Sequence, residues 1–564
     1  MKYPNKFSYG QLFAFSGLDG ECLQARDFTA VLQNTPIRIR FHLPEWIELR
    51  LDVPASTRFD AVLSDVIESV EQGVKVVFMK QDTLAGYALV MPTIETEKGA
   101  SREMKSYTLK DKAIQETIVT TDAGDVVVLR TWNSDHGYSF TFSWGIQDAR
   151  IYTEEEIEEI VRGRKAYYEN KPKCKEEKYE RLYYKCLSVN KVNVYTAEGT
   201  LPCRWTTPDR VPHKFMWLWD SAFHAMSFMQ YDVEMAKDAL WAILSQQAED
   251  GFIAHMYIPD GRRSKITQPQ VLAWATWCFY EKTKDKAFIE KCLPILKKYL
   301  LWAVKERDIN QNGLLEWATD YANVTCRCDE SGLDNSPRFD TLDTLDAVDF
   351  SVYLAHDAGY VAKICAELSD KEGCEQFQAL HDRVKDKINE LLWDEQDGMY
   401  YDRTFEGKLT KVKTPFSFLP MFAGLASAEQ AKRMVENLTD EATFWTEMPA
   451  PSISKQHPLY SPDMWRGCSW LNIDYFLTLG LRRYGYLKEA EELRRRVLDS
   501  VNKWYEETGT VFEFYDADNK ISPFMLIRKG KVLEVPNYRE HVHSISDYNW
   551  TACFVTLLIN EVYL

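Results

Sequence analysis

Residues 138–144 read Tyr-Ser-Phe-Thr-Phe-Ser-Trp, and the chain changes character shortly after them. The segment alternates aromatic and small polar side chains, a pattern typical of a β-strand with one buried face. At Thr153 the chain reads Thr-Glu-Glu-Glu, which resembles a capping box with acids in the first helical turn. The sequence therefore predicts that a β region gives way to a helical region near residue 150.

The residues before this boundary predict an antiparallel β-sandwich domain over 1–150. Residues 37–43 alternate apolar and polar side chains, and residues 46–53 do so in part. The turn residues 122–125 precede an apolar run, as in a hairpin. Many short strands separated by turn residues are typical of two packed antiparallel sheets.

Beyond the boundary the hydrophobic period is helical almost to the end of the chain. Residues 151–194 predict a charged helical linker, and residues 195–564 predict about a dozen paired helices, one of them running from Asp220 to Gln247. Repeated helix pairs form either an open solenoid or a closed α/α toroid. The sequence shows no fixed repeat period, which favours the closed toroid.

The composition argues against several classes of partner. The formal charge of −17 disfavours nucleic acid and anionic membranes, because both require basic surface. No apolar run reaches the roughly 20 residues of a membrane span, and no signal-like segment follows Met1. The twelve cysteines lack a zinc or disulfide spacing, so we expect reduced thiols, a cytoplasmic protein and no metal or other cofactor. The sequence leaves the oligomeric state open.

A loop at residues 330–340 is the first candidate for chemistry. It reads Glu-Ser-Gly-Leu-Asp-Asn-Ser-Pro-Arg-Phe-Asp, so that Gly332 and Pro337 bracket Asp334. A glycine and a proline this close make a poor helix and a poor strand, which predicts a shaped loop. Asp334 is therefore either a catalytic carboxylate presented by this loop or a residue that caps a turn.

Three further segments carry polar groups among aromatic residues. Asp220 follows two tryptophans at 217 and 219, and either contacts a ligand or caps the next helix. Arg466 stands beside Trp465 and near Trp470, as in a sugar-binding wall or a buried cation–π contact. Glu513 lies in an aromatic run, where burial would raise its pKa, although the alternation also fits a strand edge without chemistry.

Together these segments resemble the inverting (α/α)6-barrel glycoside hydrolases of family 63. That family includes processing α-glucosidases and mannosylglycerate or glucosylglycerate hydrolases, and the trehalases of family 37 are related to it. The resemblance covers about 195–564 and rests on Trp219-Asp220-Ser221-x-Phe223, Glu330-Ser331-Gly332-Leu333-Asp334-Asn335-Ser336-Pro337-Arg338, Trp465-Arg466-Gly467-x-x-Trp470 and Glu513-x-Tyr515-Asp516, with His255 and Gln268-Pro269 in support. In such enzymes a β-sandwich commonly precedes the barrel.

The resemblance implies a role for each matching residue. Asp334 would be the general acid and Glu513 the general base, because a glycosidic oxygen leaves well only when protonated and water attacks well only when deprotonated. The implied substrate-binding residues are Trp219 and Asp220 in the innermost subsite, Gln268, Arg338 and Arg466 on sugar hydroxyls, Trp317, Trp465 and Trp470 as walls, and also Phe223 and His255. Asn335 and Ser336 replace the bulkier pair often found after the acid, which bears on substrate choice.

The sequence thus predicts an inverting glycoside hydrolase whose partner is a small α-glucoside or related oligosaccharide or glycoside. Trehalase-, α-mannosidase- or glycosylglycerate hydrolase-type specificity on the same fold is an alternative. A non-catalytic carbohydrate-binding or regulatory barrel is another. A helical scaffold is disfavoured, because it would show a fixed repeat.

Two other acidic patterns are better explained as structure. Asp340, Asp343, Asp346 and Asp349 recur every three residues, as metal-binding acids of terpene synthases do, but the adjacent pair of acids that such sites use is missing. Helix capping near Ala347 is the favoured role. Residues 308–313 resemble the first half of a calcium loop, yet Thr319 stands where the bidentate glutamate belongs, which favours a turn.

Overall fold

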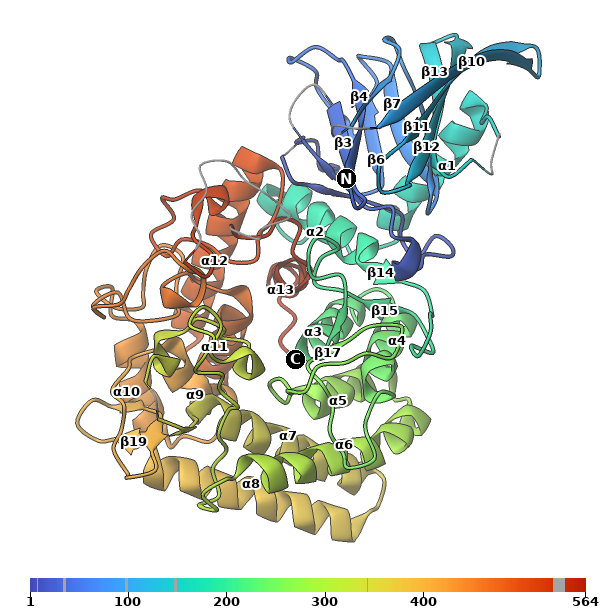
Figure 1. The fold of residues 1–564 in the computed structure, drawn as a ribbon. Coiled ribbons are helices and arrows are strands. Elements are labelled where there is room, and N and C mark those ends of the chain that lie inside the picture. The colour runs from blue at the N-terminus through green and yellow to red at the C-terminus, as the bar shows by residue number, and fades with distance from the viewer. Residues whose placement is uncertain (8, 34–36, 97–99, 147–149, 342, 531–542) are drawn as a thin grey trace.

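The computed structural model describes residues 1–7, 9–33, 37–96, 100–146, 150–341, 343–530 and 543–564. A β-sandwich built from the N-terminal strands adjoins a ring of helices built from the rest of the chain (Figure 1). This architecture confirms the predicted fold class, an antiparallel sandwich followed by an α/α barrel. The division of the chain at residues 150 and 194 stays a prediction.

The sandwich consists of two antiparallel sheets, a five-stranded sheet in the order β1-β2-β3-β4-β9 and an eight-stranded sheet in the order β10-β11-β12-β13-β8-β7-β6-β5. The strands are β1 Leu12–Phe13, β2 Ala30–Leu32, β3 Ile37–His42, β4 Trp46–Leu51, β5 Ala61–Val62, β6 Val66–Ser69, β7 Val74–Lys80, β8 Thr83–Ala88, β9 Thr93–Thr96, β10 Ser101–Leu109, β11 Lys112–Thr120, β12 Val126–Ser134 and β13 Gly137–Trp144.

Aromatic packing holds the two sheets together. In β3 the apolar residues are buried while Arg38 and Arg40 are half-buried, as alternation predicts. The ring of Phe41 lies 5.2 Å from that of Phe142 in the opposite sheet, centroid to centroid. Most of strand β13 is buried on both faces, and Ser139 on its polar side donates to Glu154 of α1. The alternating segment 138–144 is therefore an inner strand.

The remaining elements are mostly helices. They are α1 Glu154–Glu169, α2 Glu180–Val192, α3 Leu218–Phe228, α4 Val233–Leu244, α5 Leu272–Thr283, α6 Lys286–Arg307, α7 Val348–Glu367, α8 Lys371–Leu391, α9 Leu419–Phe422, α10 Ala428–Leu438, α11 Leu471–Arg483, α12 Leu487–Thr508 and α13 Asn549–Ile559. Short strand pairs decorate the loops: β14 Val194–Tyr195 with β15 Trp205–Thr206, β16 Met216–Trp217 with β17 Met256–Tyr257, β18 Leu345–Asp346 with β21 Arg403–Thr404, and β19 Trp393–Asp394 with β20 Met399–Tyr400.

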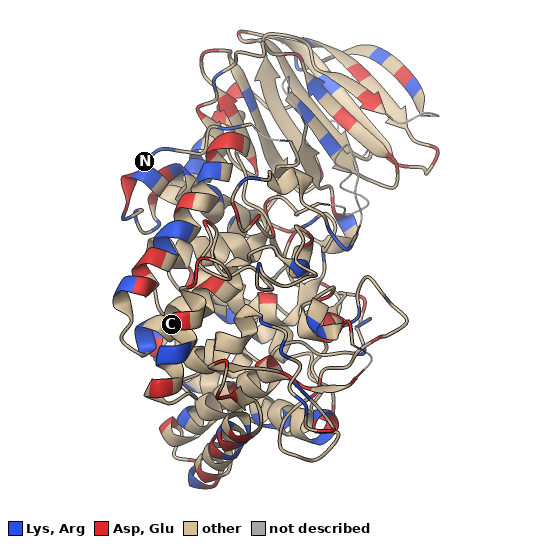
Figure 2. Ribbon diagram, turned by 90° about the vertical axis from the view of Figure 1, so that its left-hand side faces the viewer, with Lys and Arg blue, Asp and Glu red and all other residues tan. Residues whose placement is uncertain are grey.

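Helix burial separates an inner from an outer ring. Nearly every residue of α3, α11 and α13 is buried, whereas α8, α10 and α12 bury one face only. An inner helix contacts its neighbours on all sides and is therefore buried all round, whereas an outer helix keeps one solvated face. Acidic and basic segments alternate along the outer helices on the side shown in Figure 2.

Helix α2 closes the ring rather than only linking the domains. It packs on α13, and Asn190 donates to Asn549 of that helix at 2.8 Å. Lys185 of α2 forms an ion pair at 2.9 Å with Asp547, and both side chains are fully buried. The segment predicted as a linker thus contributes to the barrel's packing.

Local details confirm one prediction and correct another. Thr153 and Glu156 form the predicted capping box at the start of α1. The single helix predicted from Asp220 to Gln247 is wrong, because α3 ends at Phe228 and Asp232 caps a second helix, α4. The side chain of Asp232 accepts a hydrogen bond from Met235 N, which makes the restart favourable.

Two further features concern the cysteines and the helices. All twelve cysteines are free thiols in the structure. Among the described residues, none of the helices combines the length and the apolar character that crossing a membrane requires.

Candidate active site

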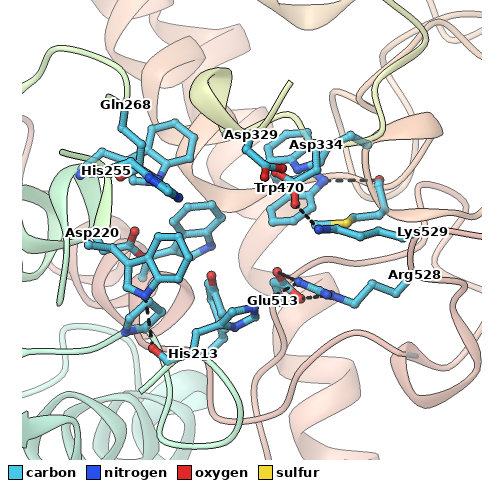
Figure 3. Close-up of a pocket in the computed structure, with 18 residues that line it drawn as sticks. His213, Asp220, His255, Gln268, Asp329, Asp334, Trp470, Glu513, Arg528 and Lys529 are labelled. Carbon is cyan, nitrogen blue, oxygen red and sulfur yellow. Dashed lines mark hydrogen bonds and ion pairs between the residues drawn. The ribbon is translucent and has the colours of Figure 1, made fainter. Parts of the chain in front are cut away.

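The loops that lead into the inner helices enclose a pocket of about 230 Å³ (Figure 3). These loops come from distant parts of the chain, and the barrel brings them to one end. The pocket is lined by Pro208, His213, Trp217, Trp219, Asp220, His255, Gln268, Asp329, Gly332, Asp334, Met464, Trp465, Trp470, Glu513, Arg528, Lys529, Tyr548 and Trp550.

The loop of Asp334 takes its shape from Gly332 and Asn335. Gly332 has φ +74°, and a Cβ added there would lie 2.5 Å from the Trp219 ring, so only glycine allows this approach. The Asn335 amide donates to Asp463 and accepts from the backbone of Trp465, both at 3.0 Å. Asn335 therefore fastens the Asp334 loop to the loop of Trp465.

Glu513 belongs to an extended segment in front of α13. Its backbone N–H donates to Ile545 O at 2.8 Å, and Tyr515 exchanges two backbone hydrogen bonds with Ser469. The segment is thus strand-like, as the alternation suggested. The Glu513 side chain nevertheless lines the pocket.

Two consecutive basic residues, Arg528 and Lys529, form ion pairs with the two candidate catalytic carboxylates. Arg528 donates to both carboxylate oxygens of Glu513 at 3.2 Å, and Lys529 Nζ lies 2.7 Å from Asp334 Oδ2. Lys529 has φ +56°, a conformation that non-glycine residues rarely adopt. In Figure 3 both cations approach from the same side of the pocket.

These contacts decide the charge of the acidic side chains. Burial raises the pKa of Asp334, but the Lys529 ammonium and the Arg528 guanidinium outweigh burial and hold that pKa below its usual range. Asp329 has its pKa raised by burial and by the nearby Asp334 charge. The free site therefore holds Asp334 ionised.

The opposite side of the pocket carries aromatic and amide groups (Figure 3). Gln268 Oε1 accepts from Trp219 N at 3.2 Å, and Asp220 keeps one buried carboxylate oxygen without a hydrogen-bond partner. Burial, with smaller contributions from Asp209 and Glu513, raises the pKa of Asp220 well above its usual value. A hydroxyl of a bound ligand could supply the hydrogen bond that this buried oxygen of Asp220 lacks.

Further side chains line the pocket, His255 near Gln268 and Trp470 near Asp334 (Figure 3). Burial lowers the pKa of His255 to about 4, so its ring is neutral. The rings of Trp465 and Trp470 are stacked 3.7 Å apart and nearly parallel. Asp220 lies within the first turn of α3, whose cap is Trp217, so it does not cap that helix.

Three side chains could present ligand atoms to a metal within the part of the chain that the structure describes. A thiol and two carboxylates, from Cys326, Asp329 and Asp334, lie within 4.8 Å of one another. Lys529 is among them, at 2.9 Å from Cys326 Sγ as well as beside Asp334. Its ammonium already supplies the positive charge that this group requires.

The structure brings together Asp334, Glu513, Trp219, Asp220, His255, Gln268, Trp465 and Trp470 from the predicted set. The described lining does not include Arg338, Trp317, Arg466 or Phe223. Phe223 instead packs beside Trp219, with 5.6 Å between ring centroids. Arg466 is paired with Asp340 at 2.7 Å and donates to Asn335 O at 3.0 Å.

Arg338 and Trp317 belong to a closed cluster outside this lining. Arg338 donates to Asp349 and Asp402, and all three side chains are at most 5% exposed. Trp317 Nε1 donates to Asp349 Oδ1 at 2.9 Å, and its ring stacks on Phe350. Arg338 has its hydrogen bonds satisfied by these carboxylates, so a sugar hydroxyl is not needed as a partner.

The other acidic patterns also form internal contacts. Asn310 and Asn312 donate to the two carboxylate oxygens of Asp346 at 2.7 and 2.9 Å. Asp308 accepts from Gly313 N, which makes a turn of the calcium-like sequence. The residue at the cap of α7 is Ala347, so the expected aspartate cap near it is wrong.

Several residues that line the pocket were not predicted from the sequence. They are His213, Asp329, Arg528, Lys529, Tyr548 and Trp550, among others. His213 donates through Nδ1 to Asp209 at 2.8 Å, and its Nε2 lies 3.4 Å from Arg528 Nη2. The adjacent Arg-Lys pair at 528–529 was the one available signal, but a charged pair is usually a solvated surface.

The family model described as "Mannosylglycerate hydrolase MGH1-like glycoside hydrolase domain" matches residues 212–551, more than half of the chain. This chain belongs to that glycoside hydrolase family. The predicted resemblance to family 63 enzymes is thereby confirmed, and the matched region contains every lining residue of the pocket except Pro208.

Individual relatives match parts of the chain. An uncharacterized protein of Borreliella burgdorferi is 30% identical over 43% of this chain, and the chain spans half of that protein's length. A mannosylglycerate hydrolase of Selaginella moellendorffii is 26% identical over 55% of this chain and 77% of its own.

Solved structures support the fold. The GH63 mannosylglycerate hydrolase of Thermus thermophilus in complex with Tris has a TM-score of 0.54 and 22% identity, covering 67% of this chain and 100% of its own. At this identity the likeness shows the barrel and says nothing of the substrate.

Proposed function

We propose that this protein hydrolyses a small α-glycoside with inversion, with Asp334 as general acid and Glu513 as general base. The observation that carries this proposal is the pocket itself, whose lining combines two carboxylates from distant segments with several aromatic rings and the amide of Gln268. A sugar needs an aromatic face and several hydroxyl partners at once, and its hydrolysis needs an acid and a base.

In this mechanism Asp334 gives its proton to the glycosidic oxygen as the bond to the anomeric carbon breaks. Glu513 takes a proton from a water that attacks the anomeric carbon from the other face. Arg528 donates a hydrogen bond to each carboxylate oxygen of Glu513, which fixes the orientation of that carboxylate. Asp220 and Gln268 would hold hydroxyls of the sugar, and Trp465 and Trp470 would form a wall of its site.

We take an α-glucoside as the first candidate substrate. A glycoside whose aglycone is an acid, such as glycerate, is the second, and a specific observation favours it. Lys529 places a cation in the pocket beside the proposed acid Asp334, where the leaving group would lie. Relatives named mannosylglycerate hydrolase, whose substrate name contains such an acid, support the same candidate.

The test is a panel of α-linked disaccharides, trehalose, α-glucosylglycerate and α-mannosylglycerate, assayed for released sugar. Asp334→Asn should slow the natural substrate about 100- to 10,000-fold, the usual contribution of a general acid. An α-glycosyl fluoride needs less protonation and should be partly spared. Glu513→Gln should slow both kinds of substrate, because both require an activated water.

Proton NMR of the sugar as it is released tests inversion. An α-glycoside should give the β-anomer first. Early accumulation of the α-anomer would contradict the single-displacement mechanism. A protein that binds the panel but hydrolyses no member would instead be the non-catalytic barrel.

A further inference from the structure

Lys529 holds the proposed general acid in the wrong protonation state for catalysis. Its ammonium lies 2.7 Å from Asp334 Oδ2, a contact that stabilises the carboxylate. A general acid must carry a proton when the glycosidic bond breaks. The free enzyme therefore has to break this ion pair before Asp334 can act.

The other charged and titratable groups around Asp334 do not relieve this conflict. Arg528 is engaged with Glu513, and His255 is neutral. Asp329 favours a proton on Asp334 but is itself paired with the Cys326 thiol. Lys529 is thus the group whose movement decides the charge of Asp334.

The structure shows which part of Lys529 can move. The backbone on either side is fixed, because Met464 N donates to Ile527 O and Gly530 N donates to Asp463 Oδ2 at 2.9 Å. The side chain has a flexible four-carbon stem, lines the pocket and is 25% exposed. The ammonium can therefore swing to a new partner while the backbone stays in place.

We propose that Lys529 is a specificity-determining residue: its ammonium keeps Asp334 ionised until an anionic leaving group draws it away and lets Asp334 take a proton from solvent. The proton then passes from Asp334 to the glycosidic oxygen, and Glu513 releases to solvent the proton that it took from the attacking water. When the anionic product leaves, Lys529 pairs again with the Asp334 carboxylate, so charge and protons balance over the cycle. A neutral leaving group offers Lys529 no better partner than Asp334. This inference rests on the proposed function and explains why an acidic aglycone would be preferred for catalysis and not only for binding.

The first experiment compares α-glucosylglycerate with α-glucosylglycerol, which replaces the carboxylate by a neutral alcohol, and runs the mannosyl pair in parallel. The wild-type enzyme should prefer the acid at least tenfold in kcat/KM, on the order of 1.4 kcal/mol. Lys529→Met should lose this preference partly by a gain on the neutral substrate, and the basic limb of its pH profile should move to higher pH. Lys529→Arg should keep the preference, and Lys520→Met, at an exposed site outside the pocket lining, is the control.

A residue that merely bound the anion would behave differently. Its loss would raise KM for the acid and leave the neutral substrate and the pH profile unchanged, and that result overturns the proposal. If the wild-type enzyme hydrolyses neither substrate pair, and if Asp334→Asn leaves the rate on every other substrate of the panel unchanged, the proposed function fails as well.

The second experiment does not depend on hydrolysis. The pKa of Asp334 is measured by carbon NMR of labelled aspartate carboxyls, assigned with Asp334→Asn, with and without D-glycerate. Glycerate should raise this pKa in the wild type and leave it unchanged in Lys529→Met. Equal titration with and without glycerate in the wild type would refute the switch, whatever the enzyme hydrolyses.

Discussion

Two clusters of cations and carboxylates lie in this barrel, and they differ in enclosure. Arg338 with Asp349 and Asp402 is sealed, with side chains at most 5% exposed. Lys529 and Asp334 keep 25% and 19% of their side chains exposed, and they line the pocket together with Arg528 and Glu513, which are only 6% and 3% exposed. The same residue types thus build a structural joint in one place and a candidate site for chemistry in the other.

Enclosure decides what each cluster can do. In the sealed cluster every charge has a fixed partner, so removing one leaves the others buried without compensation. In the pocket, water or a ligand can replace a lost partner, so the charges can exchange partners during a reaction. The comparison predicts that mutations in the sealed cluster change stability and mutations in the pocket change activity.

The largest effect is expected at Arg338. Arg338→Met should lower the free energy of unfolding by about 3–5 kcal/mol, because it leaves Asp349 and Asp402 as unpaired buried charges. Urea denaturation followed by circular dichroism measures this loss. Arg528→Met is the matched variant in the pocket and should lose less stability but most of the activity. A stable Arg338→Met protein that has lost substrate binding would restore Arg338 as a sugar ligand.

This contrast also shows the limit of the sequence. The alternation at 138–144 and the capping box at Thr153 are local, so the sandwich and the start of the helical region could be predicted. The motif around Asp334 could be recognised because catalysis restricts residue type and spacing together. The enclosure of a side chain could not be predicted in this way, because it depends on packing between distant segments. No sequence feature near Arg338 indicates that it pairs with Asp402.

The cations of the pocket were missed for the same reason. Arg528 contacts Glu513 from 15 residues further along the chain, and no sequence motif relates the two. Lys529 contacts Asp334 from a distant segment of the chain. The catalytic roles of Asp334 and Glu513 stay predictions, since geometry places them in one pocket without showing the reaction.

A smaller effect is expected at His213, which lines the pocket and contacts Arg528. Asp209 holds His213 Nδ1, so Nε2 accepts from Arg528, and Arg528 orients Glu513. His213→Phe removes the acceptor and should lower kcat about tenfold, or about 1.4 kcal/mol in the barrier, with little change in KM. His213→Gln retains an acceptor and should recover part of the rate.

Steady-state kinetics at several pH values measure the effect at His213. His136→Phe, at an exposed site in the sandwich, is the control and should behave as wild type. Unchanged kcat in His213→Phe would show that Arg528 is held by Glu513 alone. A loss of stability as large as that of Arg338→Met would place His213 in a sealed cluster and break the comparison.

The smallest effect is expected at Arg466, which is intermediate between the two clusters. Its guanidinium is 21% exposed and pairs with Asp340, which is 33% exposed, while a second bond reaches Asn335 O in the Asp334 loop. Partly exposed ion pairs contribute about 0.2–1 kcal/mol, so Arg466→Met should lower stability by about that amount. Loosening the Asp334 loop should lower kcat/KM only a few-fold, because Asn335 is still held by Asp463 and by Trp465 N.

Arg466→Lys keeps the charge and should restore the stability more fully than the rate, since lysine lacks the fork that reaches Asp340 and Asn335 together. If Arg466→Met instead abolished sugar binding while stability stayed unchanged, Arg466 would contact the substrate, as the family resemblance implied. The partial exposure of its side chain would then indicate its role better than its ion pair with Asp340 does.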